Sequence, residues 1–179
     1  NGLTQTLTYS DVNTPISIAS TSGFLIRVTN HFGAQLNLAY DAAGNLIKMI
    51  DPAGGIYTYA YSEPSTVVLS GTVPVNNLTS VIFPDGKKRI YWYNEQDKTA
   101  NTNLPAALTG ITDENGTRHA TIMYNSNGKA ISSELAGGVE KYTVSYPNLF
   151  TQSSATDPLG STRTYNFETS LGVARSLGQ

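Results

Sequence analysis

Five aspartates could act as acids or bases, and each lies in a cluster of turn-forming residues. They are Asp41, Asp51, Asp85, Asp113 and Asp157. Glycoside hydrolysis needs a pair of carboxyl groups about 5–9.5 Å apart. A carboxylate beside Gly also caps a turn, because it accepts the backbone N–H two residues on while Gly supplies the positive φ. We expect the second role, and the sequence predicts neither a catalytic residue nor an enzyme.

The residues expected to form these turns recur along most of the chain. Asp or Asn stands first, Pro often second and Gly fourth, which is the pattern of a type I turn. The predicted structural turn residues are Tyr40, Asp41, Gly44, Asp51, Pro52, Gly54, Asp85, Gly86, Asp113, Gly116, Asn125, Gly128, Asp157 and Gly160.

Metal and thiol chemistry find little support in the sequence. The two histidines, His31 and His119, lie far apart, and no HxH or HExxH spacing occurs. Cysteine is absent, which excludes disulfides, thiol catalysis and Cys-based zinc sites in this sequence. We expect no metal site and no cofactor.

One basic run could bind a ligand. Lys87, Lys88 and Arg89 directly precede the aromatic segment of Tyr91, Trp92 and Tyr93. Cations beside aromatic rings can hold a polyanion or a sugar. The alternative is an ordinary strand with solvated cations outside and aromatic side chains inside. Alternation places both kinds of residue on each face, which keeps a glycan or polyanion site open.

Composition excludes several classes of protein. The 179 residues carry a net charge of −2, with only 13% charged residues, and no basic tail that would suggest nucleic-acid binding. No apolar stretch is long enough for a membrane-spanning helix, and no signal peptide opens the sequence. Because the chain starts at Asn1 rather than Met and ends at Gln179, we expect a fragment of a longer protein.

The elements that must position these residues are strands. Apolar and polar residues alternate in runs such as Leu3–Tyr9, Tyr57–Tyr61 and Tyr142–Tyr146, which is the two-residue period of a strand. No amphipathic helix of ten residues is found. The window from Asn94 to Ala107 is the least strand-like and is predicted to be a long loop.

The turns recur at a near-constant spacing. Intervals of 21, 32, 30, 21 and 23 residues separate Gly33, Gly54, Gly86, Gly116, Gly137 and Gly160. The two longer intervals are explained by insertions at 62–78 and 94–108. Each unit then predicts a β-hairpin of about 21 residues, repeated roughly six times, in an all-β array of stacked antiparallel hairpins with about twelve strands.

These repeats resemble a known family. Tyr40-Asp41-Ala42-Ala43-Gly44-Asn45-Leu46 followed by Asp51-Pro52-Ala53-Gly54-Gly55 is similar to the YD repeat of bacterial Rhs (rearrangement hotspot) proteins. Weaker copies start at Tyr93, Tyr124 and Phe167, whereas Tyr61-Ser62 and Tyr146-Pro147 lack the aspartate. The resemblance implies one array over 1–179. Divergent leading strands would occupy about 1–22, recognisable repeats 23–172, and a tail leading to further chain 173–179.

The resemblance also implies a function. In this family the repeats form a ribbon or shell that can enclose a C-terminal toxin, in a secreted or cell-surface protein. The expected partners are neighbouring repeats and an encapsulated toxin, with edge-to-edge self-association where strand edges stay open. An Asp-Pro motif near the end of such cores is associated with autoproteolysis, but we interpret Asp157-Pro158 as an ordinary turn. A carbohydrate-binding or adhesion module stays the alternative.

Overall fold

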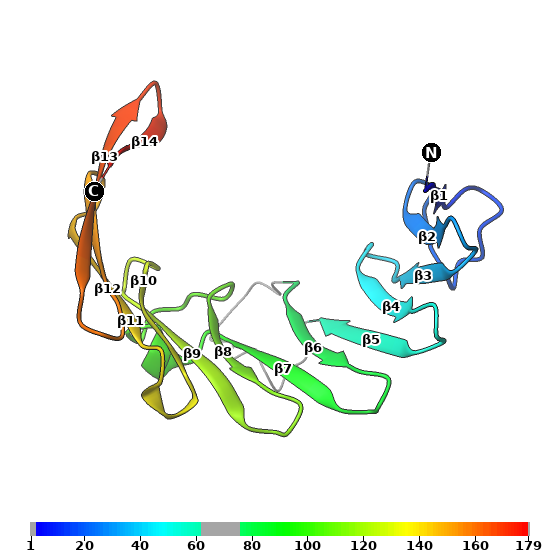
Figure 1. Ribbon diagram of the computed structural model, residues 1–179, viewed down its shortest axis with the longest axis horizontal. Helices are drawn as coiled ribbons and strands as arrows, with labels where there is room; N and C mark the ends of the chain where they lie inside the picture. The colour runs from blue at the N-terminus through cyan, green and yellow to red at the C-terminus, as the bar shows by residue number, and fades with distance from the viewer. Residues whose placement is uncertain (1–2, 62–75, 179) are drawn as a thin grey trace. The chain divides into compact units, whose positions relative to one another are not determined.

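The chain folds into strands joined by short turns (Figure 1). The computed structural model describes residues 3–61 and 76–178, so most of the insertion predicted at 62–78 lies outside the described residues. The two short 3-10 helices are η1 (Gln96–Lys98) and η2 (Ala136–Gly138). The strands are β1 (Gln5–Tyr9), β2 (Leu25–Asn30), β3 (Gln35–Tyr40), β4 (Leu46–Ile50), β5 (Ile56–Tyr61), β6 (Leu78–Ile82), β7 (Lys88–Tyr93), β8 (Leu108–Thr112), β9 (Arg118–Tyr124), β10 (Ala130–Leu135), β11 (Tyr142–Asn148), β12 (Gln152–Thr156), β13 (Thr162–Ser170) and β14 (Val173–Gly178).

The predicted fold class is confirmed, because the described strands pair antiparallel with strands adjacent to them in sequence. The described residues hold fourteen strands, two more than the predicted twelve. The six repeats account for β2–β13. The extra strands are β1, within the predicted divergent leader, and β14, within the predicted tail.

The described residues divide into two compact units. Unit 1 comprises residues 3–61 and 78–89, and unit 2 comprises residues 76–77 and 90–178. In unit 1 each strand from β1 to β5 pairs with the next. In unit 2 the same order runs from residues 90–93 of β7 to β14.

A β-bulge recurs where a strand ends in tyrosine. Tyr40 pairs with Leu46, whereas the preceding Ala39 pairs with Lys48, which leaves Ile47 as an extra residue on β4. The same shift of register falls between the tyrosine and the residue before it at Tyr9, Tyr61, Tyr93 and Tyr124. A bulge bends its strand and increases the local twist. The repeat is therefore defined by a bulge as well as by a turn.

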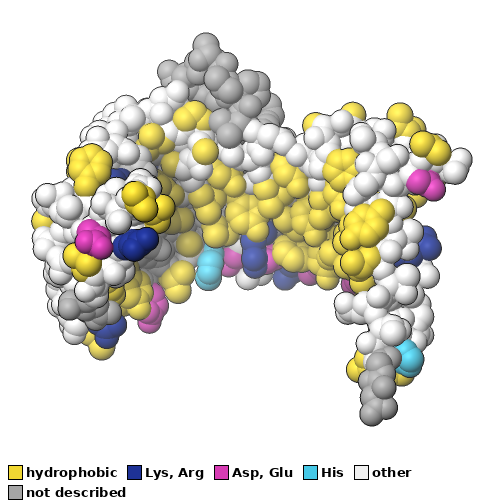
Figure 2. Space-filling view, turned by 90° about the horizontal axis from the view of Figure 1, so that it is seen from above, with side chains coloured by type: hydrophobic (Ala, Val, Ile, Leu, Met, Phe, Trp, Pro, Cys, Tyr) yellow, Lys and Arg dark blue, Asp and Glu magenta, His cyan; other side chains and the backbone are white. Residues whose placement is uncertain are grey.

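The interior is thin and largely polar. Among the described residues, the buried hydrophobic side chains are Ala19, Ala39 and Val81. The buried polar ones are more numerous: Ser10, Thr79, Ser80, Asn94, Thr99 and Thr109. Figure 2 shows the matching surface, mostly white with yellow hydrophobic patches and few charged side chains. We infer that hydrogen bonds within and between hairpins carry an unusually large share of the specificity of this fold.

The predicted loop from Asn94 to Ala107 is confirmed. It contains no strand and only the single turn of η1. The Asn94 backbone N–H donates to the Ala107 carbonyl across the base of the loop, at 3.1 Å. The loop thus connects β7 to β8 in the place where other repeats have a four-residue turn.

Candidate functional site

The aspartate turns share one hydrogen-bond pattern. In the turn after β3, the Asp41 carbonyl accepts the Gly44 N–H at 3.1 Å, and Asp41 Oδ1 accepts the N–H groups of Ala43 and Asn45 at 2.9 and 2.8 Å. Gly44 has φ +87°, which side chains rarely tolerate. The hydrogen bonds from Asn45 are the main reason that the pKa of Asp41 lies below its ordinary value. Oδ1 therefore binds two backbone N–H groups of the turn, while Oδ2 accepts the Asn45 side-chain amide at 2.9 Å.

The same pattern recurs at five other turns. The first residue accepts the N–H groups two and four positions on, and its carbonyl accepts the N–H of the glycine three positions on. These first residues are Asn30, Asp51, Asp113, Asn125 and Asp157, and the glycines are Gly33, Gly54, Gly116, Gly128 and Gly160. Pro52 takes the second position of the Asp51 turn. Because Asn30 and Asn125 act as the aspartates do, the pattern needs an acceptor rather than a charge.

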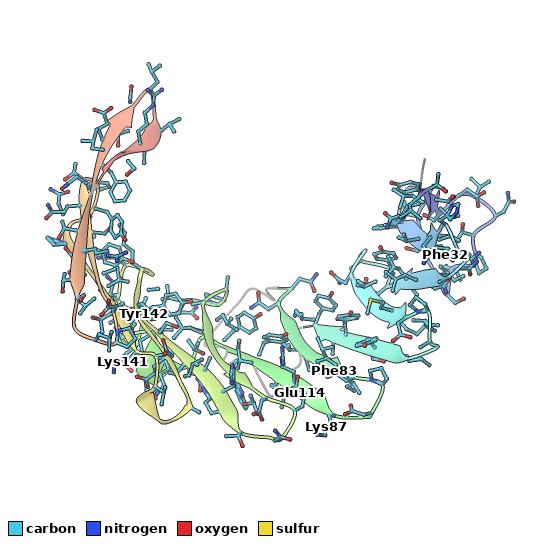
Figure 3. The ribbon with its side chains drawn as sticks, viewed as in Figure 1. Phe32, Phe83, Lys87, Glu114, Lys141 and Tyr142 are labelled. Atoms are coloured by element: carbon cyan, nitrogen blue, oxygen red, sulfur yellow. The ribbon has the colours of Figure 1, made fainter. Side chains whose placement is uncertain are left out.

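The turn at Asp85 is built differently. Phe83 occupies its first position, with the Gly86 N–H bound to the Phe83 carbonyl at 2.9 Å. Asp85 is third, and its Oδ1 accepts the Lys87 N–H at 3.1 Å. Figure 3 labels Phe83 and Lys87 at this turn between β6 and β7. The sequence pattern places Asp85 in a turn. It does not show that Phe83, whose side chain has no oxygen to accept a hydrogen bond, occupies the first position that Asp or Asn holds in the other turns.

Tyrosine hydroxyls tie the open ends of the hairpins, a role that the sequence analysis missed. The Tyr40 hydroxyl donates to the Leu25 carbonyl at 2.8 Å, from the end of β3 to the start of β2. The same bond joins Tyr61 to Leu46, Tyr124 to Leu108 and Tyr146 to Ala130, at 2.8–3.1 Å. Donor and acceptor lie 15 or 16 residues apart each time. The recurring spacing of tyrosine was the available signal.

This tie persists where the family pattern is broken. Tyr61 precedes Ser62, and Tyr146 precedes Pro147, so neither is followed by aspartate. Both hydroxyls still reach their carbonyls. Burial raises the pKa of Tyr40, Tyr61 and Tyr124 above the ordinary tyrosine value. The hydroxyl form that donates the bond is therefore retained to higher pH than in a solvated tyrosine.

The predicted basic and aromatic segment is divided between the two units. Lys87, Lys88 and Arg89 belong to unit 1, where the Arg89 guanidinium lies 5.7 Å from the centre of the Phe83 ring. Tyr91, Trp92 and Tyr93 belong to unit 2. There Trp92 Nε1 donates to the Thr112 hydroxyl at 2.8 Å, and burial raises the pKa of Tyr93. Every side chain of β7 is half-buried, so none is a freely exposed platform.

A second polar cluster lies beside this segment in unit 2. Arg118 binds both carboxylate oxygens of Glu95 at 2.9 and 2.7 Å and also donates to the Thr109 carbonyl at 2.8 Å. The Thr109 hydroxyl, fully buried, donates to Glu95 at 2.6 Å. Burial alone raises the pKa of Glu95, but the bonds from Arg118 and Thr109 outweigh burial and hold that pKa below its ordinary value. All these groups are paired, which favours a structural role.

Neither histidine takes part in a metal site within the described residues. His31 lies at the tip of the Asn30 turn, where its ring meets Phe32 edge-on at 5.3 Å. His119 lies on β9 and is exposed. In the described part of the chain, no three His, Asp or Glu side chains come together as metal ligands would. No helix there is long and apolar enough to cross a membrane.

A hollow in unit 2 carries a different set of side chains. It has a volume of about 230 Å³ over β11, β12 and β13. Tyr142, labelled in Figure 3, and Tyr165 line it together with Arg163, Asp157 and Ser161. Tyr142 is 47% exposed. Two phenol rings with a guanidinium, a carboxylate and a hydroxyl form the mixed apolar and polar lining that suits a sugar.

Comparison with known proteins finds one family model that matches part of the chain. The RHS Repeat family model matches residues 20–56, which contain the Asn30, Asp41 and Asp51 turns. This match confirms the resemblance to Rhs and YD-repeat proteins in that part of the chain. No curated protein matches the chain.

Two solved structures are similar to the chain over most of its length. They are the crystal structures of TcdB2-TccC3-Cdc42 and TcdB2-TccC3-TEV, at 17% and 19% sequence identity, both with a TM-score of 0.38. Each match covers 86% of this chain and 10% of the other chain. The chain therefore spans about a tenth of the length of these two proteins.

Proposed function

We propose that the chain is a non-catalytic wall segment of a secreted or surface Rhs-repeat protein, with hairpins that form part of a shell around a C-terminal toxin. The observation that carries this proposal is the repeated, self-contained hairpin. Six turns are capped by a side-chain acceptor, and four tyrosine hydroxyls tie hairpins together. A sheet held together in this way needs no deep apolar core, and its two faces stay available to contents and surroundings.

The absence of catalysis is part of the same proposal. Each aspartate predicted to lie in a turn has an Oδ1 that accepts backbone N–H groups of its own turn. A general acid or base needs a carboxyl group free to exchange a proton with substrate. Glycoside and ester substrates should therefore show no turnover. Turnover that is abolished by the double variant Asp41→Asn/Asp51→Asn would overturn this part of the proposal.

Protease protection in the whole parent protein tests encapsulation. We expect a C-terminal segment that resists protease while the repeats are folded and is digested once they are unfolded by denaturant. Equal digestion in both conditions would exclude a closed shell. Edge pairing is tested separately by light scattering of this chain, since every residue of β1 and β14 is exposed. Mass that increases with concentration is expected, and a monomer at all concentrations would contradict it.

Carbohydrate binding is the second candidate function, and the hollow lined by Tyr142 and Tyr165 favours it. Aromatic rings stack on the apolar face of a sugar, while Arg163 and Asp157 can bind its hydroxyl groups. A glycan array can compare Tyr142→Ala and Tyr165→Ala with Trp92→Ala and Lys88→Ala. Loss of binding only in the first pair would assign the hollow. Loss only in the second pair would favour the segment from Lys87 to Tyr93. If the unaltered chain binds no glycan, carbohydrate binding is excluded as a candidate function.

A further inference from the structure

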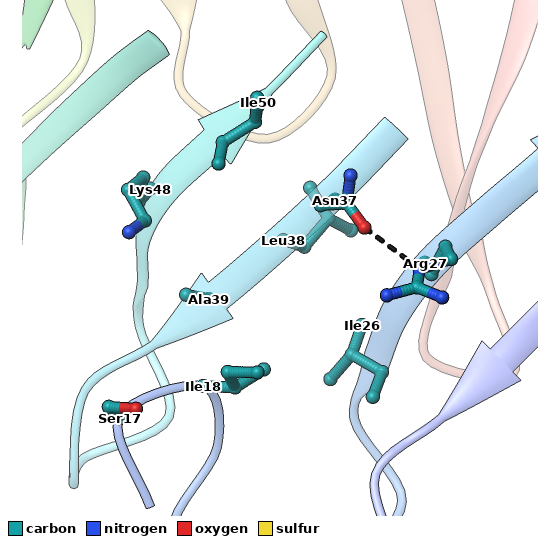
Figure 4. Close-up of a pocket in the computed structure, with 9 residues that line it drawn as sticks. All are labelled: Ser17, Ile18, Ile26, Arg27, Asn37, Leu38, Ala39, Lys48 and Ile50. Atoms are coloured by element: carbon teal, nitrogen blue, oxygen red, sulfur yellow. Dashed lines mark hydrogen bonds between the residues drawn. The ribbon is translucent and has the colours of Figure 1, made fainter. Parts of the chain in front are cut away.

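A cavity of about 310 Å³ lies on unit 1, where the segment joining β1 to β2 folds back against the sheet. Figure 4 draws the residues that line it. They are Ser17, Ile18, Ile26, Arg27, Asn37, Leu38, Ala39, Lys48 and Ile50. Its volume is at the lower end of the range of about 300–1,000 Å³ that is usual for small-molecule sites.

The wall of this cavity is held in place by hydrogen bonds. The Ile18 carbonyl accepts the Tyr40 backbone N–H at 2.7 Å, which attaches the segment to the end of β3. The neighbouring Ala19 is only 4% exposed. At the base of the segment, the Ser10 hydroxyl donates to the Thr21 carbonyl and accepts the Phe24 N–H. The cavity is therefore preformed, and a ligand would not have to order its wall.

Two positively charged side chains, Arg27 and Lys48, lie on the same face of the sheet at this cavity. Arg27 on β2 pairs with Asn37 on β3, which in turn pairs with Ile50 on β4. Lys48 precedes Ile50 by two residues and pairs with Ala39, so it projects to the same face. A bulge leaves Ile26 as the extra residue between the pairs Thr8–Arg27 and Tyr9–Leu25, and Ile26 lines the cavity beside Arg27.

Neither cation is neutralised by the described part of the protein. Arg27 Nε donates to Asn37 Oδ1 at 2.8 Å, a bond that fixes the plane of the guanidinium and leaves its terminal nitrogens available (Figure 4). Neither Arg27 nor Lys48 forms an ion pair with a described residue. Both side chains are exposed, whereas the remaining lining is chiefly aliphatic. The site thus combines an apolar wall with positive charge.

We propose that this cavity binds a small organic anion with an aliphatic body, such as a medium-chain carboxylic acid. The carboxylate would bind Arg27 and Lys48, because a guanidinium held in one plane suits the two oxygens of a carboxylate. The aliphatic body would pack against Ile18, Leu38 and Ile50. A sugar suits the site less well, since no aromatic side chain lines it. A cationic amphiphile is opposed by both charges.

Nuclear magnetic resonance titration of the ¹⁵N-labelled chain tests the proposal, with octanoate as the probe. We expect saturable shifts confined to amides in residues 17–50, and no matching shifts with octylammonium, octanol or acetate. Arg27→Gln/Lys48→Gln should weaken octanoate binding by about tenfold or more, since it removes both charge-assisted bonds. The matched control is Lys141→Gln/Arg175→Gln, which makes the same change of charge in unit 2 and should leave binding unchanged.

Charge reversal sharpens the test. Arg27→Glu/Lys48→Glu should abolish octanoate binding and allow octylammonium to bind in the same cavity, because the aliphatic wall is retained. Octanoate and octylammonium shifting the same amides equally in the unaltered chain would overturn the proposal in favour of purely apolar binding. No saturable shift with octanoate, or equal binding to the glutamine variant, would overturn it outright.

Discussion

The turn after Tyr40 and the loop after Tyr93 are closed by the same kind of hydrogen bonds, although the loop is far longer. Asp41 donates its N–H to the Asn45 carbonyl and accepts the Asn45 N–H on Oδ1. Asn94 does the same across a far longer loop, since its N–H donates to Ala107 and its Oδ1 accepts the Leu104 N–H at 2.7 Å. The residue after the tyrosine thus closes both connections.

The two connections differ in how far solvent reaches their hydrogen bonds. The Asp41 turn is open to water, whereas Asn94 is fully buried and also donates to Asn103 at 2.7 Å. Water can replace a lost partner in an exposed turn, but it cannot readily do so in a buried loop. The comparison teaches that the same hydrogen-bond pattern contributes little to stability where it is exposed and much where it is buried.

Replacing Asn94 should have the largest effect. In Asn94→Ala the fully buried amide is removed and the part-buried Leu104 N–H loses its acceptor, and we expect the free energy of unfolding to fall by about 3 kcal/mol. Urea denaturation followed by circular dichroism measures the loss, and faster amide exchange at Leu104 would localise it. The control is Asn127→Ala at an exposed turn, expected to stay within about 0.5 kcal/mol. Equal losses in the two variants would contradict the contrast between buried and exposed connections.

Arg118→Met should have the next largest effect, because it leaves Glu95 partly buried without its cation. We expect a loss of about 2 kcal/mol at neutral pH, less than for a fully buried pair because both side chains retain some exposure. The lowered pKa of Glu95 means that its contribution is present above the ordinary glutamate pKa and lost as pH falls through the folded-state value.

Urea denaturation of the parent and Arg118→Met at several pH values tests this dependence. The two stabilities should converge as the solution becomes acidic. The surface pair of Lys141 and Glu134 provides the control, since Glu134→Gln should change stability little at any pH. A stability gap that stays constant down to low pH would show that the Glu95 charge is not what Arg118 stabilises.

Removing one tyrosine hydroxyl should have a smaller effect. Tyr124→Phe keeps the ring and loses the bond to Leu108, at a cost of about 1 kcal/mol. Because burial raises the pKa of Tyr124, the stability due to its neutral form is complete below the ordinary tyrosine pKa and is lost as pH rises through the folded-state value. Alkaline denaturation should therefore be less steep in Tyr124→Phe, with exposed Tyr142→Phe as the control. Unchanged stability and slope would show that the tie is dispensable.

Asp41→Ala should have the smallest effect of the four. It removes the acceptor for Ala43 and Asn45, but the Ala43 N–H is exposed to solvent and the Asn45 N–H is only part-buried. We expect a lower melting temperature, with a decrease less than that of Tyr124→Phe. Asp41→Asn should recover most of the loss, because Asn125 caps its own turn in the same way. A decrease as large as that of Asn94→Ala would remove the distinction drawn between the two connections.

Much of the fold could be predicted from short-range patterns. Strand alternation, the turn glycines and the loop from Asn94 to Ala107 all depend on residues a few positions apart, so sequence displays them directly. Strand β1 was expected from the alternation over Leu3–Tyr9, whereas β14 lies in the segment that was predicted to be a tail. The role of Phe83 as the first residue of its turn could not be predicted, because the Pro-Asp-Gly signal is compatible with more than one alignment of the four turn positions.

The candidate sites were less predictable, because they combine residues from several strands. Alternation could show that Lys88 and Trp92 share a face of β7, but not that the Trp92 indole would donate to Thr112. Neither the hollow of unit 2 nor the cavity of unit 1 could be predicted from a motif. Tyr142 and Tyr165 lie on different strands, and so do Arg27 and Lys48.

By itself, the sequence determined a repeating antiparallel hairpin, because its turns and strands are specified by neighbouring residues. Only the tertiary structure decided which polar groups became buried and which side chains met. Tyr40 and Leu25 are far apart along the chain, and their hydrogen bond exists only once β2 and β3 pair in one register. The same holds for the cavity that brings Arg27 and Lys48 to one face: register and the folded-back segment create it, and neither is written in any local pattern.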